Sequence, residues 1–290
     1  MSATETLHLT GSAPLAVGPA LGSLGAHAIP ALDIIEGSTL SRALRLPSGR
    51  ILAARITPHA EGVRVETASL SPDARAELTG AVRTWFDLDA DTEAIAHSLG
   101  GDALLAPLLA ARPGLRVIGS PDPAETALVT VLGQQVSLAA ARTFSGRLVA
   151  AFGADGPALP GGTPTRLFPR PELLAERDPE EVRAAVGLTG ARAKTVIALA
   201  RTLADGLELG PGADPVRARA GLLAVPGIGP WTADYLGVRV LGDRDGFVPG
   251  DLVLRRALGS IPAREAEERS RVWRPYRAYA LMHLWTAAAY

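Results

Sequence analysis

Residues 225–235 read VPGIGPWTADY, in which a proline and two glycines stand directly before a run with helical character. We expect one helix to end near Val225 and the next to begin at Pro230, because glycine suits a tight turn and proline suits the first position of a helix. Ile228, between the two glycines, is expected to pack into the junction. The stretch therefore predicts two helices joined by a short hairpin.

The start of the second helix also predicts a site for an anion. The first backbone N–H groups of a helix have no partner inside that helix, and the helix dipole favours negative charge beside them. We expect the amides of Gly227, Gly229 and Thr232 to hold one DNA phosphate. The alternative is an ordinary glycine turn between two helices, with no ligand.

Composition sets the limits of what the chain can do. It has 290 residues, 47% of them hydrophobic, which is typical of a globular protein of one large domain or two to three small ones. The net charge of −1 and the pI of about 6.5 argue against a broad basic surface and so against nucleic-acid binding. A phosphate held by main-chain amides avoids that objection, because it needs no such surface.

Missing residue types exclude several chemistries. The chain has no cysteine, which excludes disulfides, thiolate metal sites and cysteine nucleophiles. Its five histidines show no ligand spacing, so we expect no metal held by side chains. Residues 11–32 lack Asp, Glu, Lys and Arg, but glycines and prolines interrupt them and no basic segment precedes them. We therefore expect neither a membrane span nor a signal peptide, and we expect the protein to be cytoplasmic.

The pattern along the chain changes near residue 88. Up to that point, short β-branched runs separated by turns predict an antiparallel sheet, and Ser71 with Pro72 predicts the start of a helix. We therefore expect an α+β domain over 1–88, followed by a mostly helical region. Residues 153–171, rich in glycine and proline, are expected to form a surface loop.

The longer segment 222–259, LLAVPGIGPWTADYLGVRVLGDRDGFVPGDLVLRRALG, carries a hairpin, a Gly/Pro-rich loop and an aspartate that opens the next helix. This order resembles the helix–hairpin–helix DNA glycosylase superfamily, and within it the 3-methyladenine DNA glycosylase II branch. The similarity covers roughly residues 100–286. It implies two helical lobes with an active cleft between them, one over 113–243 with the hairpin and one made from 89–112 and 244–290.

Asp251 follows Pro-Gly and precedes an apolar run, which is typical of a helix N-cap. The resemblance implies that it is also the catalytic carboxylate, and one residue can serve both purposes. The helix N-terminus favours its charged form. An anion there would stabilise an oxocarbenium-like transition state and orient or activate the attacking water.

Related bifunctional glycosylases carry a lysine just after the hairpin, which attacks the sugar. Here Trp231 stands at that place, and the only lysine, Lys194, belongs to a separate helical run where we expect it to be solvated. The chain is therefore expected to be monofunctional, without lyase activity at the abasic site.

The resemblance places three aromatic residues, Trp231, Tyr235 and Trp285, in the pocket for the base. Aromatic faces attract a cationic alkylated base, although core packing would also explain such residues. Ser23 and Leu252 stand where the family can carry further aromatics. These departures indicate a different or narrower range of substrates.

A base inside a duplex must be extruded, and the gap has to be filled. The resemblance assigns this wedge to Gln134 and Gln135, with Gln135 at the intercalating position; a buried amide in a helix junction is the alternative. Two arginines near the C-terminus, Arg274 and Arg277, are candidates for phosphate contacts. The resemblance also allows a structural Na⁺ or K⁺ on three hairpin carbonyls, those of Leu223, Val225 and Ile228.

These observations favour a monofunctional DNA glycosylase that removes alkylated bases of the 3-methyladenine type from damaged double-stranded DNA in base excision repair, acting as a monomer. Two alternatives remain. One is a non-enzymatic helix–hairpin–helix protein that only binds DNA. The other is a glycosylase of the same fold that acts on deaminated or oxidised bases.

Overall fold

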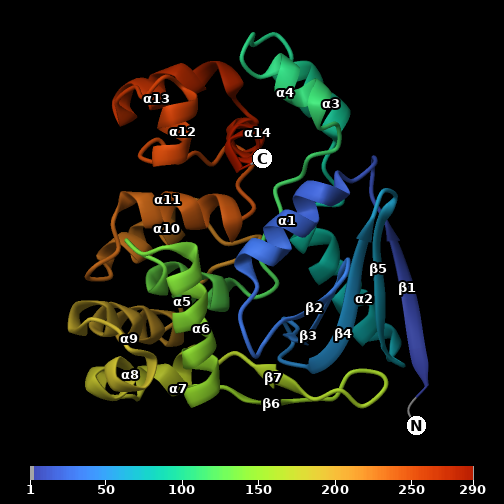
Figure 1. Ribbon diagram of the computed structural model, residues 1–290, viewed down its shortest axis with the longest axis vertical. Helices are drawn as coiled ribbons and strands as arrows, with labels where there is room; N and C mark the ends of the chain where they lie inside the picture. The colour runs from blue at the N-terminus through green and yellow to red at the C-terminus, as the bar shows by residue number, and fades with distance from the viewer. Residues whose placement is uncertain (1–2, 290) are drawn as a thin grey trace.

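The computed structural model describes residues 3–289, which form an N-terminal sheet domain and a larger helical region (Figure 1). The sheet is antiparallel with the strand order β1-β5-β4-β3-β2. Its strands are β1 (Thr4–Thr10), β2 (Ile34–Glu36), β3 (Thr39–Arg45), β4 (Ile51–His59) and β5 (Gly62–Ala68). The predicted α+β fold of this part is confirmed.

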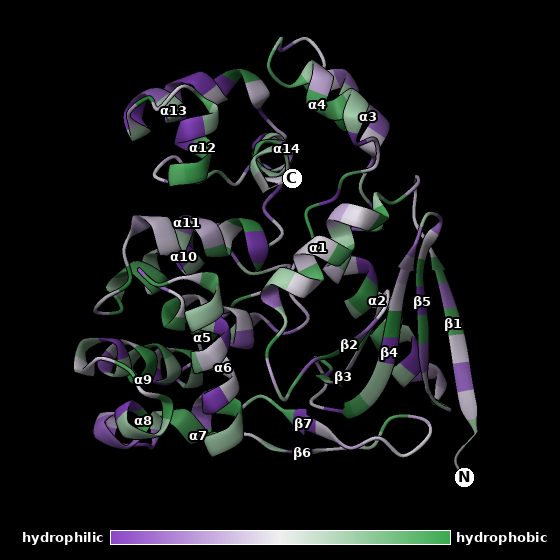
Figure 2. Ribbon diagram, in the orientation of Figure 1, coloured by the Kyte–Doolittle hydropathy of each residue, from purple (hydrophilic) through white to green (hydrophobic). Residues whose placement is uncertain are grey.

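Two helices accompany the sheet, α1 (Val17–His27) and α2 (Pro72–Trp85). The Ser71 hydroxyl accepts a hydrogen bond from the Ala74 amide, so the predicted N-cap of α2 is present. Leu78 and Val82 of α2 are fully buried in one core with strand residues. Helix α1 lies between the sheet and the helical region (Figure 1), and it is mostly pale or green in Figure 2 because small and apolar residues dominate it.

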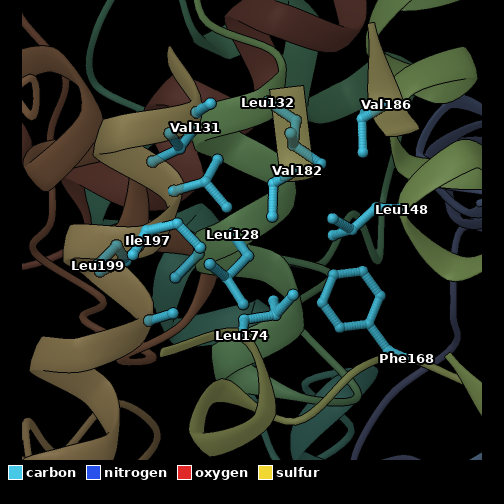
Figure 3. Packing of buried hydrophobic residues seen from close by; sticks show 14 of the residues in the cluster. Leu128, Val131, Leu132, Leu148, Phe168, Leu174, Val182, Val186, Ile197 and Leu199 are labelled. Carbon is cyan, nitrogen blue, oxygen red and sulfur yellow. The ribbon is translucent and has the colours of Figure 1, made fainter. Parts of the chain in front are cut away.

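The helical region contains a large core built from the middle of the chain. Figure 3 shows Leu128, Leu148, Val182 and Ile197 packed against one another from four different helices. The elements that contribute are α5 (Pro123–Leu132), α6 (Leu138–Phe152), α7 (Pro171–Ala175), α8 (Pro179–Val186), α9 (Gly190–Ala204), α10 (Pro215–Ala224) and α11 (Pro230–Arg239).

A second helical core joins segments far apart in the sequence. Helix α4 packs on α14, and the Trp273 indole donates to Asp102 Oδ2 at 2.8 Å. The elements around this core are α3 (Thr92–Leu99), α4 (Ala106–Ala111), α12 (Leu252–Ala257), α13 (Ala263–Ser270), the 3-10 helix η1 (Arg271–Trp273) and α14 (Arg277–Ala289). The domain limits at residues 88, 112 and 243 stay predictions. No helix within residues 3–289 is long and apolar enough to span a membrane.

The expectation of a surface loop over 153–171 is wrong in part. This segment forms two short antiparallel strands, β6 (Ala154–Gly156) and β7 (Thr165–Leu167), and β7 packs on β3 of the main sheet. Leu159 and Phe168 are buried there. Strands of three residues are too short to show an alternating pattern of apolar and polar residues. The glycines and prolines of the segment therefore predict a loop instead.

A buried ionic cluster connects the sheet to the helical core. The Arg42 guanidinium on β3 contacts the Glu125 carboxylate of α5 at 2.5 Å and the Asp33 carboxylate at 3.1 Å. All three side chains are almost completely buried. Because a buried charge needs a partner of opposite sign, this cluster fixes how the two parts of the molecule meet.

We predict that Arg42→Ala lowers the free energy of unfolding by about 3–5 kcal/mol, since it leaves two carboxylates buried without a counter-charge. Urea unfolding followed by circular dichroism measures the loss. The matched control is Arg64→Ala, which removes an exposed strand arginine paired with Glu66 and should cost less than about 1 kcal/mol. Similar small losses for both variants would contradict the role given to the cluster.

Candidate active site

The hairpin between α10 and α11 forms as the sequence predicts, with Ile228 buried in the helical core. Gly227 has a φ of +93°, and a Cβ at this position would lie 2.1 Å from Thr195 Oγ1 on α9. A side chain is therefore excluded by both backbone conformation and space. Gly229 is different, since a Cβ there meets nothing within 4 Å and its φ is −100°.

The hairpin leaves several amides free. Gly229 is the N-cap of α11, and its carbonyl accepts from the Ala233 amide in the usual helical way. Across residues 3–289, no protein acceptor receives a hydrogen bond from the backbone amides of Gly227, Gly229 or Thr232. Such a row of unpaired N–H groups at a helix start is suited to an anion.

Gln134 connects this hairpin to the loop between α5 and α6. Its side-chain amide donates to the Gly227 carbonyl at 3.2 Å and to Thr232 Oγ1 at 3.0 Å, while its backbone carbonyl accepts from the Arg192 guanidinium. These contacts differ from the role of wedge expected for Gln134, because a side chain held by the hairpin is not free to enter DNA. Gln135 is exposed with a φ of +55°, and its role as the wedge stays a prediction.

Asp251 is the N-cap of α12, as the sequence predicts, and it also accepts two indole hydrogen bonds. Oδ1 accepts from the Leu254 amide at 2.8 Å and from Trp285 Nε1 at 2.9 Å. Oδ2 accepts from Trp231 Nε1 at 3.2 Å. The residue is only 8% exposed. Three N–H donors from three helices therefore hold one carboxylate in a fixed position.

The three aromatic residues lie together beside Asp251. Trp231 and Tyr235 are stacked, with ring centroids 5.1 Å apart and an angle of 9° between the planes. Tyr235 and Trp285 are 6.0 Å apart and tilted by 44°. Trp231 keeps 38% of its surface exposed, although large apolar side chains are usually covered. Open aromatic faces next to a carboxylate suit a flat, positively charged ligand.

His27, which the sequence did not single out, contacts the same aromatic cluster from α1. Its Nδ1 lies 2.8 Å from the Ser23 carbonyl oxygen and its Nε2 lies 3.3 Å from the Tyr235 hydroxyl. Ser23 and His27 line a cavity of about 160 Å³ that Trp285 closes on one side. Leu252, which like Ser23 stands where the family can carry an aromatic residue, is 55% exposed. No local pattern could have revealed His27, since it and Tyr235 are 208 residues apart.

The expected phosphate contact of Arg277 is wrong. This side chain is buried and donates to Asp245 and Glu267, with its guanidinium over the Phe247 ring. Arg274 is more exposed but also faces Asp245, at 3.6 Å. The sequence could not show these acidic partners because they come from a loop and a neighbouring helix. Lys194 is exposed on α9, as expected.

Two family models match the chain. The AlkA N-terminal domain matches residues 6–122, and the HhH-GPD superfamily of base excision DNA repair proteins matches residues 128–274. The chain belongs to the HhH-GPD superfamily. The family expected from the hairpin segment is thus confirmed.

Among individual relatives, the chain is 41% identical to a probable bifunctional transcriptional activator/DNA repair enzyme AlkA of Mycobacterium tuberculosis, over 98% of this chain and 57% of the relative. It therefore spans little more than half of that protein. It is 31% identical to the DNA-3-methyladenine glycosylase 2 of Escherichia coli, over 91% of both chains.

Solved structures share the fold. A 3-methyladenine DNA glycosylase from Archaeoglobus fulgidus superposes with a TM-score of 0.82 at 20% identity, over 99% of this chain and 98% of that one. An 8-oxoguanine glycosylase/lyase from Clostridium acetobutylicum, in complex with double-stranded DNA, superposes with a TM-score of 0.67 at 15% identity. The match covers 89% of this chain and 97% of that one. The predicted sheet domain followed by a helical helix–hairpin–helix region is confirmed.

We predict that alanine lowers the stability much more at Gly227 than at Gly229. Gly227→Ala forces a Cβ against Thr195 and should cost about 1–3 kcal/mol of stability. Gly229→Ala has both space and an ordinary φ, so it should cost less than about 1 kcal/mol, the size of a poorer helix N-cap. Thermal unfolding of both variants checks this, and equal melting temperatures would argue against the packing described for Gly227.

Proposed function

We propose that this protein is a monofunctional DNA glycosylase that hydrolyses the N-glycosidic bond of alkylated bases, of the 3-methyladenine type, in damaged double-stranded DNA. The observation that carries the proposal is the Asp251 carboxylate, held by the α12 N-terminus and by two indoles beside an open aromatic pocket. The names of the Escherichia coli and Archaeoglobus fulgidus relatives support the same reaction.

The hairpin explains how a protein of net charge −1 can hold DNA. The free amides of Gly227, Gly229 and Thr232 bind one phosphate by hydrogen bonds and by the dipole of α11, without lysine or arginine. The target nucleotide turns out of the duplex into the pocket, and Gln135 fills the space it leaves. The Clostridium acetobutylicum enzyme, which has the same fold, is in complex with double-stranded DNA, and this supports DNA as the ligand.

Bond cleavage then depends on charge placed near the sugar. The C1′–N bond breaks with its electron pair going to the base, which leaves a cationic alkylated base neutral and therefore needs no protonation. Positive charge develops on C1′ and the ring oxygen, where the Asp251 anion stabilises it. Water adds to C1′ from the side of Asp251, which orients the water and accepts its proton. Trp231, Tyr235 and Trp285 favour the cationic base before the bond breaks.

A protein that only binds DNA would need neither the buried carboxylate nor the aromatic pocket. Three N–H donors on one Asp251 side chain are more than a helix cap uses, since the cap accounts for Leu254 alone. Deaminated and oxidised bases are neutral, so an aromatic pocket gives them less attraction than it gives a cation. The arrangement therefore favours catalysis on alkylated bases over both alternatives.

We also propose that the protein acts as a monomer in the cytoplasm and that the hairpin carbonyls of Leu223, Val225 and Ile228 hold a Na⁺ or K⁺. Among the described residues, only Val225 of these three accepts a protein hydrogen bond, from the Ile228 amide at 3.1 Å. Lone pairs are thus available, and such an ion would add positive charge near the phosphate. No group of three His, Asp or Glu side chains between residues 3 and 289 could bind a metal.

The decisive prediction concerns Asp251→Asn. Asparagine caps a helix as well as aspartate does, so the fold and DNA binding should persist while base release falls by roughly 100-fold or more, the size expected for a lost electrostatic stabiliser. The assay is incubation with methylated DNA and chromatography of the free bases. Asp178→Asn, at the N-cap of the remote helix α8, should release bases at the native rate. Native activity in Asp251→Asn would remove this residue from the mechanism.

Absence of a Schiff base is a separate prediction. With Lys194 exposed on α9 and Trp231 after the hairpin, no amine is expected at C1′, so borohydride should trap no covalent protein–DNA adduct. Products should be abasic sites that break only on alkaline treatment. A trapped adduct that disappears in Lys194→Ala would show that the protein is bifunctional.

A further inference from the structure

His27 lies on the other side of the aromatic cluster from Asp251, beyond Tyr235. The two indole N–H groups point to Asp251, Tyr235 lies against both indole rings, and the Tyr235 hydroxyl lies 3.3 Å from His27 Nε2. His27 is exposed and borders two cavities, of about 160 and 70 Å³, which Trp285 and Tyr235 also line. A ligand that enters either cavity can therefore contact His27 together with Trp285 or Tyr235.

The hydrogen bonds of His27 fix which of its nitrogens carries a proton. Nδ1 lies 2.8 Å from the Ser23 carbonyl oxygen, which can only accept, so Nδ1 must be the donor. In the neutral ring, Nε2 then presents a lone pair toward the pocket. The Tyr235 hydroxyl donates to it across 3.3 Å, which is long for an O–H donor and is easily exchanged for a better one.

The charges around His27 keep that lone pair available. Although part of the residue is open to solvent, desolvation of the imidazole ring against the surrounding protein atoms and, less strongly, the nearby Arg239 guanidinium lower the pKa of His27 to about 4. Arg239 is 7% exposed, and its Nε has no hydrogen-bond partner among the described residues. A cation this close to the imidazole disfavours a second positive charge, so the ring stays an acceptor at neutral pH.

We propose that His27 is a specificity-determining residue that contacts the edge of the extruded base and favours purines with an amino group at position 6. This rests on the proposed function. When the sugar faces Asp251, position 6 of a purine lies at the opposite end from the glycosidic nitrogen, on the side of His27. Adenine-type bases carry an amino donor at this position, whereas guanine-type bases carry a carbonyl acceptor. An amino group gains a hydrogen bond to Nε2, and a carbonyl oxygen meets a second lone pair.

The test compares 3-methyladenine with 7-methylguanine, because both bases are cationic in DNA and differ at position 6. Rates of release are measured under single-turnover conditions for the native chain, His27→Phe and His27→Gln. Phenylalanine keeps a ring but has no acceptor, and the glutamine carbonyl can replace Nε2. His97→Phe, an exposed histidine on α3, is the matched control. Thermal unfolding of each variant checks the fold.

We expect His27→Phe to lower the rate for 3-methyladenine by roughly three- to tenfold, the effect of one lost hydrogen bond. The rate for 7-methylguanine should change by less than about twofold, since this base gains nothing from the lone pair. His27→Gln should recover the ratio of the two rates, and His97→Phe should leave it unchanged. The ratio separates base reading from a structural role, because a displaced Tyr235 would slow both substrates equally.

An unchanged ratio in His27→Phe, whether both rates persist or both fall together, would overturn the assignment of His27 while leaving the proposed function intact. A native chain that releases neither base would instead remove the proposed function, and with it the reading of His27. Preference for 7-methylguanine in the native chain, lost in His27→Phe, would show that the histidine acts as a donor and would also overturn the proposal.

Discussion

The hydrogen bonds that converge on Asp251 organise the whole site. One carboxylate terminates α12 through the Leu254 amide and holds the Trp231 indole of α11 and the Trp285 indole of α14. A carboxylate offers about four acceptor positions, so three donors still leave one for a sugar or a water. The contact that fixes the pocket walls is thus the contact that places the negative charge. Any change that moves the carboxylate also moves two of the three aromatic rings.

Hydrogen bonds also join the hairpin to the loop that carries Gln134 and Gln135. Gly227, which has no side chain, packs on Thr195. The Gln134 side chain donates hydrogen bonds to the Gly227 carbonyl and to the Thr232 hydroxyl. The Arg192 guanidinium in turn donates a hydrogen bond to the Gln134 backbone carbonyl. The hairpin proposed to bind phosphate and the loop that carries Gln135 are therefore connected by hydrogen bonds. In the proposed function this connection matters for base extrusion, because the spacing between a bound phosphate and an inserted Gln135 must match the step along the DNA strand.

Much of this could be predicted from the sequence because it is local. Glycines at a hairpin, a proline at the first helical position and caps at Ser71 and Asp251 each act within four residues, and the fold follows their order. Contacts between distant segments leave no such pattern. In the Arg42 cluster, Arg42 and Glu125 are 83 residues apart in the sequence, and no local pattern predicts that they meet. Arg277 was assigned to DNA because its acidic neighbours, Asp245 and Glu267, could not be placed beside it.

The position of α1 gives the sheet domain a part in recognition. Catalytic and anchoring groups come from the helical region, but His27 and Ser23 come from α1, whose buried residues belong to the core of the sheet. The Arg42 cluster holds that sheet against α5. The far wall of the base pocket is thus set by one domain and the reactive end by another. On the proposed function, we therefore expect changes in α1, such as at Ser23, to alter the range of bases without disturbing Asp251.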